Sequence, residues 1–350
     1  MPRCSLLLLA AVPLLLHGCG GGGASKADAK YVIAVIPKGL THEFWRSIHR
    51  GAERAAADFG DSLPVKILWD GPNKESDNRE QIALVESLES QGAHGFVLAP
   101  QHSELMVPIV RQVVKRGKPF VIIDSGLDAA DLYVRYVATD NRNGGRLAAR
   151  HLLASLKDVQ SPRLVLFRYA AGSESTEQRE KGFLEEIEKA KKDNPGIRLV
   201  SDNVYAGATI TTAQAAAGPL LEEFKDKADG IFAVNESATS GMLNAMREAR
   251  LVGKIKLMGF DTSEPLIAVL KKGEIEGLIA QDPYRMGYLA VHALVSHLEG
   301  KDVAKDGKYL STGEYLITQA NVDSEETRGR IDAELQKKRK IDAPEYADKK

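Results

Sequence analysis

The side chains of this chain that are best suited to binding chemistry follow short apolar segments, at the points where those segments end. They combine two aromatic rings with carboxylate, amide and imidazole groups, and they are His42, Phe44, Trp45, Asp124, Asn235, Asp261 and Gln281. An aromatic face packs against the C–H side of a sugar ring, while carboxylates and amides pair with adjacent hydroxyls. The set therefore indicates a site for a neutral polyhydroxylated ligand.

Short apolar segments that alternate with longer amphipathic segments must position these groups. Strands are predicted at 31–37, 65–69, 94–99, 119–123, 134–138, 163–168, 197–200, 230–234, 255–260 and 277–281. Helices are predicted at 43–59, 77–91, 103–116, 142–156, 175–192, 210–225, 237–249, 263–272 and 284–299. Strands without polar alternation, separated by helices, are typical of parallel sheets covered on both faces. The predicted class is α/β, doubly wound, with ligands bound outside the carboxyl ends of the strands.

The N-terminal residues have the pattern of an export signal. Arg3 is followed by an apolar core and by Gly18-Cys19, which is typical of a secretory signal, and the core is too short to span a bilayer. The ending at 16–19 resembles a bacterial lipobox. We therefore expect a lipoprotein signal peptide at 1–18, a lipidated Cys19 and a flexible tether at 19–30. The alternative is a secreted protein cut near 22–25, and either way the chain leaves the cytoplasm.

Composition and motifs argue against several classes of function. The formal net charge of −1 in 350 residues gives no electrostatic reason to expect nucleic acid as a ligand. Cys4 leaves with the signal and Cys19 carries lipid, so no cysteine remains for a disulfide, a nucleophile or a metal site. The histidines lack metal-ligand spacing, and the sequence has no P-loop and no GxSxG motif. We expect no cofactor, no metal and no enzymatic activity.

Seven segments occur in an order that resembles a known family. They are 41–45 (THEFW), 121–124 (VIID), 138–141 (ATDN), 179–183 (REKGF), 232–236 (FAVNE), 259–261 (GFD) and 279–282 (IAQD). Over about residues 31–320 the chain resembles the ribose/galactose type of periplasmic sugar-binding protein, the receptor component of ABC importers.

The resemblance implies two Rossmann-like lobes joined by a three-strand hinge, with crossings near 139–141, 281–283 and 312–314. The first lobe is expected to comprise 31–139 plus 282–312, and the second 140–281 plus 313–322. The charged tail at 323–350 is expected to be a solvated helix or a disordered end, with contact to a partner as a further possibility.

The resemblance also implies roles for the first-lobe candidates. Phe44 and Trp45 would stack on the sugar ring, and His42 stands where the family places a polar contact. Asp124 would bind hydroxyls at the far edge of the ring. As alternatives, Trp45 could be a core residue, Asp124 could act as a cap or join a turn, and His42 could belong to a plain polar loop.

From the second lobe, Asn235 and Asp261 would bind hydroxyls, and Gln281 would bind near the hinge. Asn235 could also cap the helix that follows it. Arg179 aligns with a neighbouring arginine of the family that is usually structural, and we include it among the candidates for ligand contact.

Three positions depart from the ribose-type pattern. Ser125 and Glu177 stand where that pattern has arginine, and Glu236 stands where aspartate is common. These changes alter the hydroxyl pattern that the site can read, so ribose itself is not predicted. Candidates for replacement contacts are Lys38, Glu174 and Arg168.

The expected function is capture of a sugar or polyol and its delivery to an ABC transporter permease. The protein is expected to be monomeric, extracytoplasmic (periplasmic) and attached to the membrane by its lipid anchor only. The alternative is a receptor that passes a sugar or furanosyl signal to a sensor kinase or chemoreceptor. A transcription regulator with this fold would need a DNA-binding segment where this sequence has a signal and a tether.

Overall fold

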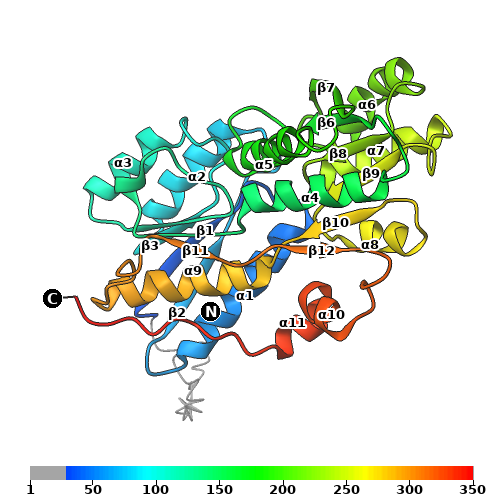
Figure 1. The fold of residues 1–350 in the computed structure, drawn as a ribbon. Helices are drawn as coiled ribbons and strands as arrows, with labels where there is room; N and C mark the ends of the chain where they lie inside the picture. The colour runs from blue at the N-terminus through cyan, green and yellow to red at the C-terminus, as the bar shows by residue number, and fades with distance from the viewer. Residues whose placement is uncertain (1–28, 350) are drawn as a thin grey trace, which may run out of the picture.

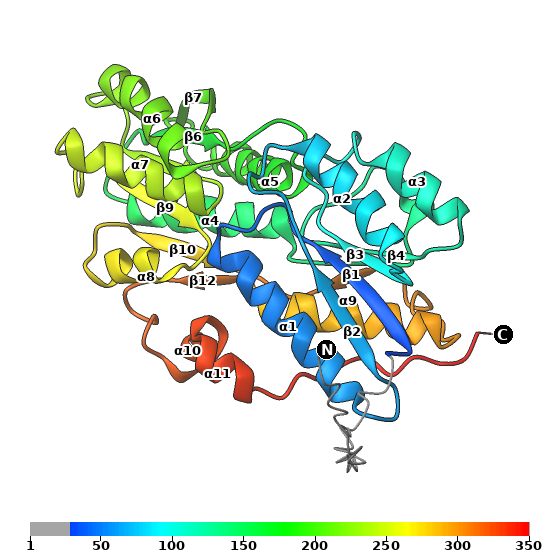
Figure 2. The same cartoon turned by 180° about the vertical axis from the view of Figure 1, so that it is seen from behind.

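Two six-stranded sheets, each between layers of helices, form the described part of this computed structural model, residues 29–349 (Figures 1 and 2). The predicted fold class, two α/β lobes, is confirmed. Within residues 29–349 no helix has both the length and the apolar character that a membrane crossing requires.

The first lobe is built on the sheet with strand order β11-β5-β4-β3-β1-β2. Its strands are β1 (Tyr31–Ile36), β2 (Val65–Trp69), β3 (Gly95–Leu98), β4 (Phe120–Ile123), β5 (Arg135–Ala138) and β11 (Tyr309–Ser311). Its helices are α1 (Glu43–Phe59), α2 (Asn78–Ser90), α3 (Val107–Lys115) and α9 (Pro283–Leu298), with a 3₁₀ turn at Ala130–Leu132.

The second lobe repeats this plan, with strand order β12-β10-β9-β8-β6-β7. Its strands are β6 (Arg163–Arg168), β7 (Arg198–Tyr205), β8 (Gly230–Ala233), β9 (Lys256–Phe260), β10 (Gly277–Ala280) and β12 (Tyr315–Ile317). Its helices are α4 (Asn141–Ser155), α5 (Glu174–Ala190), α6 (Ile210–Phe224), α7 (Glu236–Glu248) and α8 (Glu264–Lys271).

Three details of the sheets differ from the prediction. Strands β11 and β12 were not expected, because each is an edge strand of only three residues, too short for a clear sequence pattern. The β10–β12 ladder is antiparallel, whereas the other ladders between named strands of the described residues are parallel. Strand β7 also runs on to Tyr205, beyond the predicted end at 200, because its outer residues lie at a half-exposed sheet edge.

The chain passes between the two sheets at three points, each inside a predicted hinge segment. It leaves β5 for α4, leaves β10 for α9, and runs from β11 to β12. The crossing residues themselves are not strands, which corrects the expectation of three crossing strands. Two of the crossings lead straight into helices, since Asp140 and Asp282 cap α4 and α9 by accepting from the backbone N–H three residues on.

Glycines set the closest helix contacts of both lobes. In the first lobe α1 packs on α9, and a Cβ at Gly51 would lie 2.0 Å from the Tyr284 carbonyl oxygen. In the second lobe α4 packs on α5, and a Cβ at Gly145 would lie 1.9 Å from the Arg179 carbonyl oxygen. The backbones therefore meet without side chains between them, which holds Arg179 at a defined depth.

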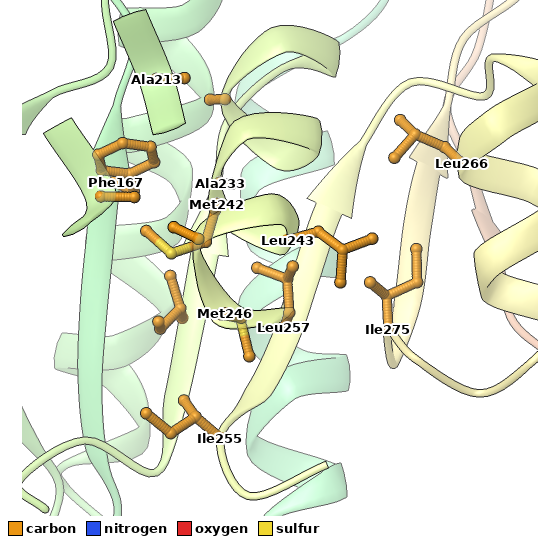
Figure 3. Close-up of a cluster of buried hydrophobic side chains, with 14 of the residues drawn as sticks. Phe167, Ala213, Ala233, Met242, Leu243, Met246, Ile255, Leu257, Leu266 and Ile275 are labelled. Atoms are coloured by element: carbon orange, nitrogen blue, oxygen red, sulfur yellow. The ribbon is translucent and has the colours of Figure 1, made fainter. Parts of the chain in front are cut away.

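The cores lie on both faces of each sheet. In the second lobe, Phe167 and Ala233 of the sheet face Met242 and Met246 of α7, as Figure 3 shows. The central strand β8 is buried along its whole length. A continuously apolar strand covered on both faces gives the rigid platform that fixes the side chains at its carboxyl end.

The charged tail packs against the body of the protein. It forms α10 (Glu325–Ile331) and α11 (Ala333–Lys338) and then runs along the first lobe (Figures 1 and 2). The prediction that residues 323–350 form a solvated helix or a disordered end is therefore wrong, because the described part of the tail packs against both lobes. Its few apolar residues, among them Ile331, Ile341 and Tyr346, pack on the cores of the two lobes.

Candidate functional site

The carboxyl ends of both sheets face one cavity between the lobes, which we call the interlobe cavity. All eight predicted contact residues lie in its lining, which comprises Lys38, His42, Phe44, Trp45, Glu75, Asp124, Tyr169, Ser173, Ser175, Thr176, Arg179, Asn235, Asp261 and Gln281. Its volume is about 30 Å³, enough for one or two water molecules. A larger ligand enters only if the lobes move apart or the lining side chains rearrange.

Two carboxylates occupy equivalent places in the two lobes. Asp124 follows β4 and Asp261 follows β9, and both have left-handed backbones, with φ of 60° and 71°. Their backbone N–H groups donate to Val137 and Ile279 on the neighbouring strands. Aspartate tolerates this conformation better than most residues, and such strain concentrates at functional sites. The paired geometry aims one buried carboxylate from each lobe at the same space.

The first lobe contributes the aromatic side of the cavity. Phe44 and Trp45, in the first turn of α1, meet edge to face with ring centroids 4.9 Å apart. The Trp45 indole Nε1 donates to Glu75 at 2.6 Å. His42 Nδ1 lies 3.2 Å from the same carboxylate. Glu75 therefore fixes the orientation of the Trp45 and His42 rings.

The second lobe contributes amide and guanidinium groups. Gln281 Nε2 donates to Asp261 at 2.7 Å, while its Oε1 is buried without a partner in the described residues. Asn235 caps α7 by accepting from the Ala238 N–H at 3.1 Å, which fixes its side chain beside the cavity. Because buried polar atoms are normally paired, the Gln281 oxygen is a candidate acceptor for a ligand hydroxyl.

Arg179 has a structural role as well as a place in the lining. Its guanidinium donates to Asn141 and to the Val234 carbonyl oxygen, and it lies 3.7 Å from the ring centroid of Phe260. Its Nη1 is 3.9 Å from Asp261. The group is almost fully buried, and burial lowers its pKa. The Arg179 guanidinium thus connects α4, the residue that follows β8 and the Asp261 carboxylate.

Burial shapes the acid–base properties of the cleft. It raises the pKa of Asp261, although Arg179 and the Gln281 amide act in the opposite direction. It raises the pKa of Glu236 to about 6, with nearby His42 opposing the shift. Burial also raises the pKa of the Tyr169 hydroxyl, which donates to Glu75. The cleft thus holds carboxylates whose charge a ligand's hydroxyl donors would stabilise.

Polar contacts join the lobes around the interlobe cavity. Lys38 of the first lobe donates to Ser173 and Ser175 of the second, at 3.1 and 3.0 Å, and lies 3.2 Å from Asp124. The Glu75–Tyr169 hydrogen bond, 2.8 Å long, also connects the two lobes. The described structure is therefore a closed arrangement.

The departures from the ribose-type pattern have local explanations. Ser125 accepts from the Ser175 N–H, so it makes an interlobe contact in place of an arginine. Glu177 turns away from the cavity and accepts from the Gly172 N–H. Glu236 lies outside the interlobe cavity, and its side chain is 3.8 Å from His42.

Of the three suggested replacement contacts, only Lys38 lies in the cavity lining. Glu174 instead accepts from the Gly126 N–H and the Tyr136 hydroxyl of the first lobe. Arg168 pairs with Glu180 and does not line the cavity.

Sequence reasoning missed Glu75 and Tyr169. Both follow strands, β2 and β6, so the rule that points to the other residues applies to them as well. The loop at 70–75 (DGPNKE) has the composition of an ordinary turn, however, and nothing in it marks Glu75 as buried.

Cys19 and the signal peptide lie outside the described residues.

Comparisons with known proteins agree with this geometry. Residues 33–302 match the family described as "Periplasmic binding protein domain". A D-ribose/D-allose-binding protein of Pseudomonas aeruginosa is 27% identical over 283 residues, covering 79% of this chain and 85% of that protein.

Two solved structures are also similar to this chain. The periplasmic component of an ABC-type sugar transport system of Hahella chejuensis is 35% identical, with a TM-score of 0.76 and coverage of 82% of this chain and 99% of that one. A carbohydrate transporter solute-binding protein of Agrobacterium radiobacter, in complex with D-arabinose, is 31% identical, with a TM-score of 0.78 and coverage of 87% and 100%. The chain belongs to the periplasmic binding protein family.

Proposed function

We propose that this protein captures a monosaccharide between its lobes and presents the closed form to an ABC permease, without catalysing a reaction. The observation that carries the proposal is the convergence of hydroxyl-binding and aromatic side chains from both lobes on one interlobe cavity. The D-arabinose complex of one similar structure and the D-ribose/D-allose name of a relative support the choice of a sugar.

The lining suits a neutral sugar in its donors and acceptors. Asp124, Asp261 and the free Gln281 oxygen accept from hydroxyls, while Lys38 and Asn235 donate to them. The Phe44 and Trp45 rings offer apolar surface to C–H groups. Because each buried polar group loses its solvation, a sugar that lacks a hydroxyl leaves a partner unpaired and binds much more weakly.

Binding is coupled to closure. Each lobe supplies part of the sugar-binding residues. These two sets of residues lie close to each other only when the lobes are closed. A sugar that contacts both sets stabilises the closed form by its differential affinity for that form. A permease that recognises both lobe surfaces then distinguishes loaded from empty protein. We place the protein outside the cytoplasm, held to the membrane by lipid on Cys19.

A thermal-shift screen of the chain from residue 26 onward, against pentoses, hexoses and polyols, tests the proposal. A sugar at 100 times its Kd adds about 2.7 kcal/mol to the free energy of unfolding. We expect stabilisation by one class of monosaccharide, and its loss in Trp45→Ala and Asp124→Asn.

The matched control is Trp69→Ala, which removes the other tryptophan, away from the cavity lining. It is expected to lower the melting temperature but to keep the shift produced by sugar. Absence of a shift with every sugar in the wild-type protein would contradict the proposal, as would turnover of a sugar by the purified protein.

A further inference from the structure

The C-terminal segment 323–349, which we call the strap, contacts both lobes and the hinge. It lies beyond residue 302, where the family match ends. In both views it runs from beneath α8 and β12 of the second lobe to α1 and α9 of the first (Figures 1 and 2). It is thus a link between the lobes in addition to the three hinge crossings.

The first part of the strap is anchored on the second lobe. The Arg330 guanidinium lies 3.4 Å from the ring centroid of Tyr315, which belongs to β12. Ile331 packs on the core of the second lobe, and Asp323 pairs with Lys271 at 2.6 Å. The stacked arginine and the partly buried isoleucine hold α10 in one position.

The last part of the strap is anchored on the first lobe. Ser47 of α1 donates to Gln336 at 3.1 Å, and Arg54 donates to the Lys337 carbonyl oxygen at 3.0 Å. Tyr346 packs on the core of the first lobe. Farther along, the Lys349 N–H donates to the Gly300 carbonyl oxygen at 3.0 Å.

Between these anchors, Arg339 contacts the hinge. Its Nη2 donates to both carboxylate oxygens of Asp282, at 2.8 and 2.6 Å. The Asp282 side chain is 1% exposed. Asp282 lies at the crossing from β10 to α9, directly after the site residue Gln281, and it caps α9 through the Arg285 N–H. A charged hydrogen bond to a buried carboxylate at a hinge restrains the backbone that must rotate on opening.

The strap also reaches the ligand site. A second cavity of about 40 Å³ lies beside the interlobe cavity and is lined by Arg330, Ile331 and Gln336 of the strap. It shares Phe44, Asp261 and Gln281 with the interlobe cavity. The strap therefore forms one wall of the cleft as well as a bridge across it.

We propose that the strap limits how far the lobes open, and that Arg339 is the positioning residue that holds the hinge at Asp282 and Gln281. The effect on affinity rests on the proposed sugar-binding function, while the effect on opening does not. Because a more closed ligand-free state loses less freedom on binding, the strap raises affinity and slows dissociation.

The first test measures opening without any ligand. Spin labels at Leu105→Cys and Ile210→Cys, exposed positions on the first and second lobe, report the interlobe distance in the chain from residue 26 onward. Arg339→Ala is expected to lengthen and broaden the distance distribution of the ligand-free protein. Arg339→Lys, which keeps the charge but not the planar fork, is expected to restore it in part.

The second test measures binding of the sugar identified in the screen. Arg339→Ala is expected to raise the Kd about tenfold, mainly through faster dissociation. The matched control is Arg328→Ala, an exposed arginine of the strap with no ion pair among the described residues. It should change neither distance nor Kd.

Unchanged distances and Kd in Arg339→Ala would overturn the proposal. If that variant does not fold, Ser47→Ala, which removes one anchor of the strap on α1, is expected to shift the distances in the same direction by less. A distance distribution identical to wild type in Ser47→Ala would then count against the strap. Failure of the wild-type protein to bind any sugar would instead contradict the proposed function and leave the distance test valid.

Discussion

At the scale of single residues, the cleft depends on charged groups that are buried before any ligand arrives. Asp124 and Asp261 are held in left-handed conformations, and Glu75 orients His42, Trp45 and Tyr169. Each buried carboxylate costs free energy of folding, which hydrogen bonds offset only in part. The site is therefore organised for binding at the expense of stability.

Glu236 provides a pH-dependent measure of that cost. Burial raises its pKa to about 6 in the folded protein, from an ordinary value of 4.5. The folded state then holds its proton more tightly than the unfolded state does, so stability falls as pH rises through this window. Between pH 5 and 7 the loss from this one group is about 1 kcal/mol.

Glu236→Gln removes this titration, so we expect the variant to lose about 1 kcal/mol less than wild type between pH 5 and 7. Urea unfolding of the sugar-free protein at the two pH values measures the difference. Glu222→Gln is the control, because that carboxylate is exposed on α6. Equal pH dependence in Glu236→Gln and wild type would show that Glu236 titrates normally.

At the scale of elements, close helix contacts position the binding groups. The crossing of α4 and α5 places Arg179, and the crossing of α1 and α9 fixes α1, whose first turn carries Phe44 and Trp45. Both crossings use glycine for steric reasons, since a Cβ would strike the backbone of the other helix. Hydrophobic periodicity predicts these helices but does not reveal which residues meet.

Gly51→Ala tests the α1–α9 crossing. The added Cβ would lie 2.0 Å from the Tyr284 carbonyl oxygen, so the helices must separate. We expect a loss of about 1–3 kcal/mol in the free energy of unfolding, despite the better helix propensity of alanine. Gly329→Ala in α10 is the matched control, since a Cβ there meets nothing within 4 Å, and it should be neutral or slightly stabilising. A neutral Gly51→Ala would mean that the crossing can relax.

At the scale of the whole molecule, closure brings two half-sites together. Glu174 of the second lobe accepts from the Gly126 N–H and the Tyr136 hydroxyl of the first, yet it does not line the interlobe cavity. We therefore expect any contribution of Glu174 to binding to act through closure. Such contacts exist in the closed form and are absent when the lobes separate.

Glu174→Ala is expected to weaken sugar binding by about 1–3 kcal/mol, or roughly 5- to 150-fold in Kd, because hydrogen bonds to a charged group are lost in the closed form. Titration calorimetry measures the change. Glu177→Ala is the control, since that residue lies in the same first turn of α5 but bonds within its own lobe, to Gly172. Equal losses in the two variants would argue against a role of Glu174 in closure.

The sequence by itself determined the fold class and drew attention to eight residues that line one cavity. The fold class and seven of the residues follow from local signals: apolar strands alternate with amphipathic helices, and the carboxyl ends of parallel strands share one edge. Arg179, inside α5, was a candidate only through the family resemblance. The ligand contacts of these residues stay predictions. Segments 41–45 and 232–236 carried the family resemblance because each is a short continuous stretch near the end of one strand. A stretch of this kind can be compared without knowing the tertiary structure.

Only the tertiary structure decided which distant residues meet. Glu75 and Tyr169 are 94 positions apart, and Arg339 and Asp282 are 57 positions apart. The tail has the composition of a solvated end, and a few apolar anchors and one arginine are enough to bind it across both lobes. Contacts of this kind depend on the relative placement of complete lobes, which no local pattern of residues encodes.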